Sequence, residues 1–170
     1  MHVYYDTGVL VPLYVEEVFS DAIANYVEAR NAIISLNAFQ QLELENALRL
    51  KVFRREMDGS RCLVVLDKIK ANLADGKLVL RPVDWVLAMD AARRLGARGS
   101  AQSGCRTLDL VHVAIAVQWR CDTFVTADDR QLRAARVAGL KIVDVRTLGL
   151  RPDDPESGTP SGSAKKPDTK

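Results

Sequence analysis

The stretch Thr123-Phe124-Val125-Thr126-Ala127-Asp128 decides the fold, because it is a short apolar run that ends in an acidic residue and leads directly into a helix. That helix is predicted over residues 130–137 and is stopped by Gly139, after which residues 141–145 form another apolar run. Short apolar runs of this kind are typical of strands that are buried on both faces of a parallel sheet. The sequence here predicts two such strands and the helix between them.

The same alternation of strand and helix extends back to the amino terminus. Further strands are predicted at residues 3–5, 32–36 and 78–80. Helices are predicted at residues 9–14, 20–30, 38–57, 60–73, 85–95 and 107–117, with residues 96–104 as a loop. The expected N-caps are Ser20, Asn37, Asp84 and Thr107. The pattern predicts an α/β protein, a three-layer sandwich with helices on both faces of a parallel sheet.

Length and composition favour one globular domain. The chain has 170 residues, of which 48% are hydrophobic and 27% charged, an ordinary balance for a globular protein. Residues 1–150 are predicted to form this domain. Residues 151–170 contain mainly proline, glycine, serine and charged residues, and are predicted to be a disordered tail because they can bury little apolar surface.

Cysteine usage and hydropathy indicate the cytoplasm. Three cysteines, Cys62, Cys105 and Cys121, are scattered without a paired spacing, which argues against a disulfide framework and a zinc site. No signal peptide is visible, and the longest apolar stretch, residues 108–117, is too short to span a bilayer. We expect a cytoplasmic protein that does not enter a membrane.

Four acidic residues lie at positions where a carboxylate is costly unless it is paired with a cation. Asp6 and Asp128 each end a strand, at the sheet edge where ligands bind in open parallel sheets. Glu43 lies on the long helix predicted at residues 38–57, and Asp109 opens an otherwise apolar helix. Carboxylates that meet in a partly buried place repel one another unless a cation lies among them. The pattern suggests the site of a metal-dependent phosphodiesterase.

Each of these acids also has a structural explanation. Asp6 suits the turn before Gly8, and Asp109 suits the positive end of a helix dipole. Glu45 is an alternative to Glu43 as the site residue, because residues two positions apart on a helix point in different directions and only one of them can face the site. Asp128 and Asp129 compete for the N-cap of the following helix. His112, one turn after Asp109, is read as a core or hydrogen-bonding residue rather than a metal ligand.

A set of carboxylate ligands without a His/Cys cluster favours Mg²⁺ or Mn²⁺ over zinc. Thr7 and Thr126 could support the ligands through hydrogen bonds. The net charge is only +2, but arginines gather near the acids, and Arg106 and Arg130 are candidate contacts to the phosphates of RNA.

The chain resembles PIN-domain ribonucleases, specifically the VapC type of bacterial toxin. The resemblance rests on four segments: Tyr5-Asp6-Thr7, Glu43-Leu44-Glu45-Asn46-Ala47-Leu48, Arg106-Thr107-Leu108-Asp109 with His112, and Val125-Thr126-Ala127-Asp128 followed by Arg130-Gln131-Leu132 and Gly139-Leu140. It covers residues 2–146. Asp129 departs from the basic or neutral residue usual in the family, and the tail has no counterpart in the minimal domain.

The resemblance implies a five-stranded sheet of order 3-2-1-4-5 and metal-dependent endoribonuclease activity. The acids Asp6, Glu43, Asp109 and Asp128 would be both the catalytic residues and the metal ligands. It also implies an RNA substrate, a homodimer, and a VapB-like antitoxin that inserts a segment near the acidic pocket.

Three rival functions compete with this one, a binding module and two other kinds of protein on a similar sheet. A catalytically silent RNA- or protein-binding module on the same fold would have its acids neutralised by the nearby arginines. A dehalogenase-type phosphatase needs two aspartates spaced D-x-D after the first strand, and Asp6-Thr7-Gly8 lacks the second. A response-regulator receiver is served poorly by the residues after the third and fifth strands.

Overall fold

The computed structural model describes residues 2–31 and 33–148, so the predicted tail at residues 151–170 lies outside the described residues. All five predicted strands form: β1 (Val3–Tyr5), β2 (Ile34–Leu36), β3 (Leu78–Leu80), β4 (Thr123–Thr126) and β5 (Lys141–Asp144). The helices are α1 (Thr7–Leu10), α2 (Ser20–Glu28), α3 (Ala38–Phe53), α4 (Gly59–Ala74), α5 (Trp85–Ser103), α6 (Thr107–Gln118) and α7 (Asp129–Val137). Short 3₁₀ turns, η1 (Val11–Leu13) and η2 (Val145–Thr147), follow α1 and β5.

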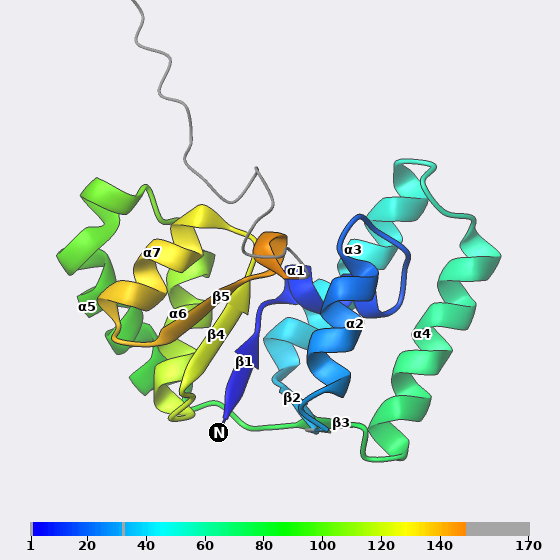
Figure 1. Cartoon of the computed structure of the whole chain (residues 1–170), viewed down its shortest axis with the longest axis horizontal. Coiled ribbons are helices and arrows are strands. Elements are labelled where there is room, and N and C mark those ends of the chain that lie inside the picture. Colours follow the sequence, from blue (N-terminus) through cyan, green and yellow to red (C-terminus); the bar gives the residue numbers. More distant parts are fainter. Residues whose placement is uncertain (1, 32, 149–170) are drawn as a thin grey trace, which may run out of the picture.

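The strands are parallel but form two sheets rather than one. β4 pairs with β1 on one side and β5 on the other, and β2 pairs with β3. β1 and β2 lie side by side (Figure 1) but form no ladder. The Tyr5 carbonyl accepts a hydrogen bond from Gln40 Nε2 at 2.7 Å, so a side-chain amide takes a place that a strand amide would fill. The expected continuous order 3-2-1-4-5 is therefore not confirmed.

Helices cover both faces of the strands, as predicted. Alternate residues of a strand point to opposite faces. Tyr5 and Val125 belong to an apolar cluster with α1–α4, whereas Tyr4 and Phe124 belong to another with α5–α7. In Figure 1 these two groups of helices lie on opposite sides of β1 and β4. The strands thus form the middle layer between two buried cores.

The α3 helix begins at a strong cap. Asn37 Oδ1 accepts from the Gln40 backbone amide at 2.9 Å, and Gln40 Oε1 accepts from the Asn37 amide at 3.2 Å, which is a reciprocal capping box. The predicted cap at Asn37 is confirmed. The helix ends at Phe53, short of the predicted residue 57, with Arg54 as its C-cap and Arg55 in the left-handed region at a φ of 62°. α4 then runs antiparallel to α3 and packs against it (Figure 1).

The predicted loop at residues 96–104 is wrong, since α5 continues to Ser103. Gly96, the first residue of the predicted loop, lies inside the helix where α5 packs closely on α6. A Cβ at Gly96 would meet Leu110 Cδ1 at 3.2 Å, so the glycine serves a close helix contact. The helix instead stops at Gly104, whose φ of 65° is the left-handed conformation typical of helix ends.

Two of the other predicted caps are shifted by one residue. Phe19 and Arg106 occupy the N-cap positions, and Ser20 and Thr107 are the first residues of their helices. The Ser20 hydroxyl bonds the Pro12 carbonyl at 2.8 Å and so ties α2 to η1. Asp84 caps α5 as predicted, accepting from Leu87 N at 3.1 Å. Among the described residues, no helix combines the length and apolarity needed to cross a membrane.

Candidate active site

A cavity of about 490 Å³ opens at the carboxyl ends of β1 and β4. Three of the four predicted acids line it: Asp6 directly after β1, Glu43 on α3 and Asp109 on α6. The other lining residues are Thr7, Gly8, Arg106, Thr107, Leu108, His112 and Gln131. Side chains separated by more than 100 positions in the sequence therefore meet at the sheet edge where the strand pattern placed a site.

Asp6 is fixed from several directions. Its backbone amide continues the ladder by donating to the Val125 carbonyl at 3.0 Å, and its Oδ2 accepts from Gly8 N at 3.3 Å, which caps α1. Its Oδ1 accepts from Gln131 Nε2 at 3.1 Å. Burial raises the pKa of Asp6, while His112 and the Gln131 amide act in the opposite direction without cancelling it. The carboxylate is held in place where its charge is costly.

Glu43 faces the cavity, and His112 lies between it and Asp6. The Thr7 hydroxyl donates to Glu43 Oε2 at 2.6 Å, and His112 Nε2 is 3.0 Å from the same oxygen and 3.7 Å from Asp6 Oδ1. Burial would lower the pKa of His112, but the hydrogen bond to Glu43 and the negative charges of Asp6 and Asp109 outweigh it, so the pKa is raised. When protonated, an imidazole in this position would partly balance the acids.

The hydrogen-bonding interpretation of His112 is confirmed on its other ring nitrogen. His112 Nδ1 lies 2.9 Å from the buried Tyr4 hydroxyl. Phe39 packs against the imidazole with ring centroids 5.2 Å apart. The ring is therefore oriented by β1 and α3 together.

Asp109 lies in the first turn of α6 and lines the cavity. Its Oδ2 accepts from the Arg106 backbone amide at 2.9 Å, so the carboxylate also satisfies a free donor at the start of the helix. The structural and functional explanations of this acid are compatible, because one oxygen is sufficient for the helix start.

Asp128, the fourth predicted acid, does not line this cavity and lies instead at a second one of about 400 Å³, with Ala127, Asp129, Arg130 and Arg133. It caps α7, accepting from Arg130 N at 2.7 Å, and its Oδ2 pairs with Arg130 Nη2 at 3.2 Å. Burial alone would raise the pKa of Asp128, but these hydrogen bonds outweigh it and lower the pKa. Of the four acids, this one has its charge most fully satisfied by the protein.

Acids from both cavities act on one thiol, that of Cys105. The thiol of Cys105 has a pKa raised to about 11, first by burial and then by the negative charges of both Asp109 and Asp128. Thr126, fully buried, bonds Gln131 and the Asp128 backbone amide, and its hydroxyl is 3.4 Å from Asp6 Oδ2. Thr7 bonds Glu43 and Thr126 lies next to Asp6, so both threonines lie beside predicted acids.

The competing acids lie outside both hydrogen-bond networks. Glu45 pairs with Arg49, one turn further along α3, at 3.2 Å. Asp129 pairs with Arg146 at 2.5 Å. The sequence reasoning missed Gln131, which contacts Asp6, and Gly8, where a Cβ would meet Asp6 Oδ2 at 3.1 Å. The spacing could have indicated Gln131, because a residue three positions after the predicted N-cap Asp128 lies in the first turn of α7, near the acids.

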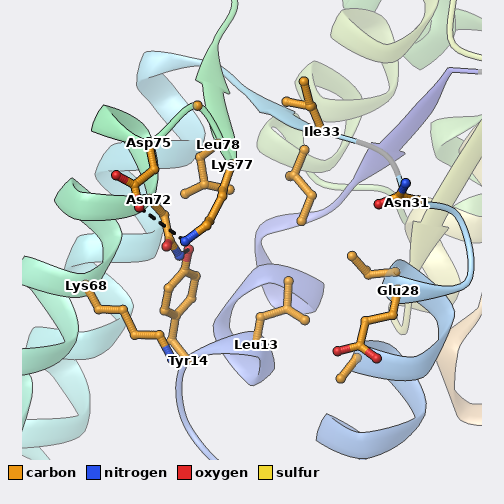
Figure 2. Close-up of a pocket in the computed structure, with 14 residues that line it drawn as sticks. Leu13, Tyr14, Glu28, Asn31, Ile33, Lys68, Asn72, Asp75, Lys77 and Leu78 are labelled. Carbon is orange, nitrogen blue, oxygen red and sulfur yellow. Dashed lines mark hydrogen bonds and ion pairs between the residues drawn. The ribbon is translucent and has the colours of Figure 1, made fainter.

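A larger cavity, of about 750 Å³, lies elsewhere and contains none of the four acids. It opens between η1, α2, α4 and the amino ends of β2 and β3, with both apolar and charged walls (Figure 2). The Asn72 amide donates to the Tyr14 hydroxyl there at 3.0 Å. Volume alone therefore does not mark the chemical site, and the convergence of carboxylates does.

Comparison with protein families decides the identity of the fold. The family model described as "PIN domain" matches residues 3–137, most of the chain. The chain belongs to the PIN-domain family. It is also 29% identical over 143 residues to "Ribonuclease VapC46" of Mycobacterium tuberculosis, an alignment that covers 83% of this chain and 95% of that protein. The resemblance to VapC-type PIN domains, which rested on four short motifs, is confirmed across the domain.

The cavity of this PIN domain suits a hard divalent cation by donor type. Asp6, Glu43 and Asp109 offer carboxylate oxygens to one space, as Mg²⁺ and Mn²⁺ prefer. Within residues 2–31 and 33–148, however, no three acidic, histidine or cysteine side chains form a ready-made metal-binding set. The imidazole of His112 instead lies between two of the acids. The donor types and the shared cavity match such an ion, whereas the spacing of these side chains does not form a metal-binding set among the described residues.

Proposed function

We propose that this PIN domain is a metal-dependent endoribonuclease that hydrolyses RNA phosphodiester bonds, and that it is the toxin of a VapBC-type toxin–antitoxin pair. One observation carries the proposal: Asp6, Glu43 and Asp109 come from β1, α3 and α6 and line one cavity. Family membership and the similarity to a protein named as a ribonuclease support the same chemistry.

In this mechanism, Asp6, Glu43 and Asp109 would hold Mg²⁺ or Mn²⁺, and Asp128 would contribute from the second cavity. The bound ion would supply an activated water and compensate the charge that develops on the phosphate oxygens. Thr7 keeps Glu43 turned into the cavity through its 2.6 Å hydrogen bond. Arg106 at the cavity wall and Arg130 beside Asp128 would hold the RNA backbone.

The test uses two neighbouring acids on the same helix. Purified wild type, Glu43→Gln and Glu45→Gln proteins are incubated with structured RNA and Mg²⁺ or Mn²⁺, or with a chelator. We expect cleavage by the wild type and by Glu45→Gln only when metal is present, and a loss of at least a hundredfold in Glu43→Gln, Asp6→Asn and Asp109→Asn. Full activity in both Asp6→Asn and Asp109→Asn would rule out the catalytic assignment.

The second candidate is a binding module of the same fold without catalysis. It is favoured by the cationic or protonatable groups that already contact the acids, namely Arg130 beside Asp128 and His112 beside Glu43. This candidate predicts tight RNA or protein binding with no cleavage at any metal concentration. Titration of Mn²⁺ into the free protein separates the two, because a module with compensated acids has no specific Mn²⁺ site.

The partners follow from the same proposal. We propose RNA as substrate, a VapB-like antitoxin as inhibitor, and a second copy of the chain in a cytoplasmic homodimer. Exposed apolar side chains at the start of α5, including Val86 and Leu87, supply a surface for protein contact. Toxicity on expression, relieved by co-expression of an adjacent upstream reading frame, tests the pairing, and sedimentation tests the dimer.

A further inference from the structure

Gln131 is a buried polar residue with a specific set of partners. It lies in the first turn of α7, only 4% exposed, and its side chain reaches across to the end of β1. Its Nε2 donates to Asp6 Oδ1 at 3.1 Å, and its Oε1 accepts from the Thr126 hydroxyl at 2.8 Å. Both ends of the amide are therefore satisfied.

These bonds have a defined direction. The Asp128 backbone amide donates to Thr126 Oγ1 at 3.1 Å, and the Thr126 hydroxyl donates to Gln131 Oε1. The hydroxyl proton goes to Gln131 rather than to Asp6 Oδ2, which is farther away at 3.4 Å. With its oxygen taken by Thr126, the amide can only present its NH₂ group to Asp6.

An amide suits this position better than other side chains of its size. A glutamate would place a second carboxylate against Asp6, and a methionine would leave both Asp6 Oδ1 and the Thr126 hydroxyl without these partners. The bonds also link Asp6 to the N-cap of α7, whose first-turn amides are held by Asp128. The position of one acid is thereby coupled to the element that carries another.

We propose that Gln131 is a positioning residue that holds the Asp6 carboxylate in its cavity-facing orientation, anchored by Thr126. This inference rests on the proposed function, in which Asp6 is a metal ligand. Partners of this kind, which orient a ligand without touching the ion, typically alter metal affinity by 10–100-fold when removed.

The experiment compares Gln131→Met with Gln40→Met in the full-length protein. Gln40 is also fully buried, but its Nε2 bonds the Tyr5 carbonyl and does not contact the Asp6 side chain. Mn²⁺ affinity is measured without RNA by electron paramagnetic resonance, kcat and KM are measured on RNA, and folding is followed by urea unfolding. We expect about tenfold weaker Mn²⁺ binding and lower kcat in Gln131→Met, with the KM for RNA within about twofold of wild type. In Gln40→Met we expect reduced folding stability with Mn²⁺ affinity within about twofold of wild type.

A second arm asks whether Thr126 acts through Gln131. Thr126→Val should weaken Mn²⁺ binding in the wild type but add little in the Gln131→Met background, because the two residues form one unit. Mn²⁺ binding by Gln131→Met equal to wild type, or an equal weakening in Gln40→Met, would overturn the positioning role and leave the proposed function intact. Absence of specific Mn²⁺ binding and cleavage in the wild type would overturn both.

Discussion

The Asp6 carboxylate is buried beside Glu43, and burial raises its pKa. A carboxyl whose pKa rises on folding lowers the free energy of unfolding at neutral pH, because the charged form is less favourable in the folded state. We therefore expect Asp6→Asn to keep or raise the free energy of unfolding in buffer with a chelator, while RNA cleavage is lost. Urea unfolding and the cleavage assay measure the two effects.

Asp128→Asn is the matched control, and its stability should change in the opposite direction. The pKa of Asp128 is lowered by Arg130 and the α7 amides despite burial, so its charge stabilises the folded state above the pKa of the unfolded chain. An asparagine remains a good N-cap, so the expected loss is below about 1 kcal/mol at pH 7. A stability loss in Asp6→Asn equal to that in Asp128→Asn would contradict the assignment of Asp6 as a destabilising acid.

The neighbouring tyrosines of β1 give a second residue-level prediction. The Tyr4 hydroxyl bonds His112 at 2.9 Å, whereas the Tyr5 hydroxyl is buried without a hydrogen-bond partner among the described residues. Tyr4→Phe is expected to lower the free energy of unfolding by about 1–3 kcal/mol, because it leaves a buried imidazole nitrogen unpaired. Tyr5→Phe should be neutral or stabilising. Urea unfolding of both variants at pH 7.5 checks the contrast.

The structure brings three of the four predicted acids to one cavity, but the partners of these acids did not follow from the sequence. Asp6 and Asp109 each follow a local pattern, a strand end or a helix start, that can be read from a few residues. Gln131 has no such pattern, because its role depends on α7 meeting the end of β1. The contact of His112 with Glu43 likewise depends on α3 and α6 meeting, which sequence spacing does not specify.

Helix caps differ in what their loss should cost. Asn37 is 1% exposed, and its side chain and backbone both bond Gln40, whereas Asp84 caps α5 through one bond at an exposed position. We expect Asn37→Ala to lower the free energy of unfolding by about 2 kcal/mol and Asp84→Ala by about 1 kcal/mol or less. Thermal and urea unfolding of the pair measure the difference. Equal losses would mean that burial of the Asn37 cap adds nothing.

Elements were easier to predict than their ends. The strands at residues 3–5 and 123–126 were predicted at their observed positions, because short apolar runs bounded by polar residues leave little choice. The end of α5 was mistaken because Gly96 has two opposite meanings, a helix breaker or a close-packing residue. Only the proximity of Leu110 decides between them.

On the scale of the whole domain, Arg146 connects η2, where it lies, to α7 and β5. It bonds Asp129 at the start of α7 at 2.5 Å and Asp144 at the end of β5 at 2.6 Å. The hydrogen bond from Arg146 lowers the pKa of Asp129. A carboxyl with a lowered pKa stabilises the fold above its unfolded pKa of about 3.9 and loses this contribution as the pH falls through its folded pKa.

We therefore expect Arg146→Gln to be less stable than wild type at pH 7, with the difference shrinking below about pH 4. High salt should also reduce the difference, since these groups are largely exposed. Arg136→Gln is the control, because Arg136 is exposed and makes no ion pair within the described residues. Unfolding free energies from pH 3 to 8 test this, and a difference that is constant across the range would contradict it.

The layered architecture was predictable, whereas the connection between β1 and β2 was not. Alternating apolar strands and helices suffice to predict helices on both faces. Whether two neighbouring strands form a ladder depends on single competing groups, here the Gln40 amide at the Tyr5 carbonyl. The family resemblance indicated the order of the strands but could not show that hydrogen bond.

The two buried cores each contain one thiol. Cys62 belongs to the core under α1–α4, and Cys121 to the core under α5–α7, and neither is in a disulfide. With the partly exposed Cys105 replaced by serine, the alkylation rates of Cys62 and Cys121 measure how readily each half of the molecule opens. Because the acidic cavity draws on both halves, equal alkylation rates would mean that the cavity cannot come apart without the whole domain opening.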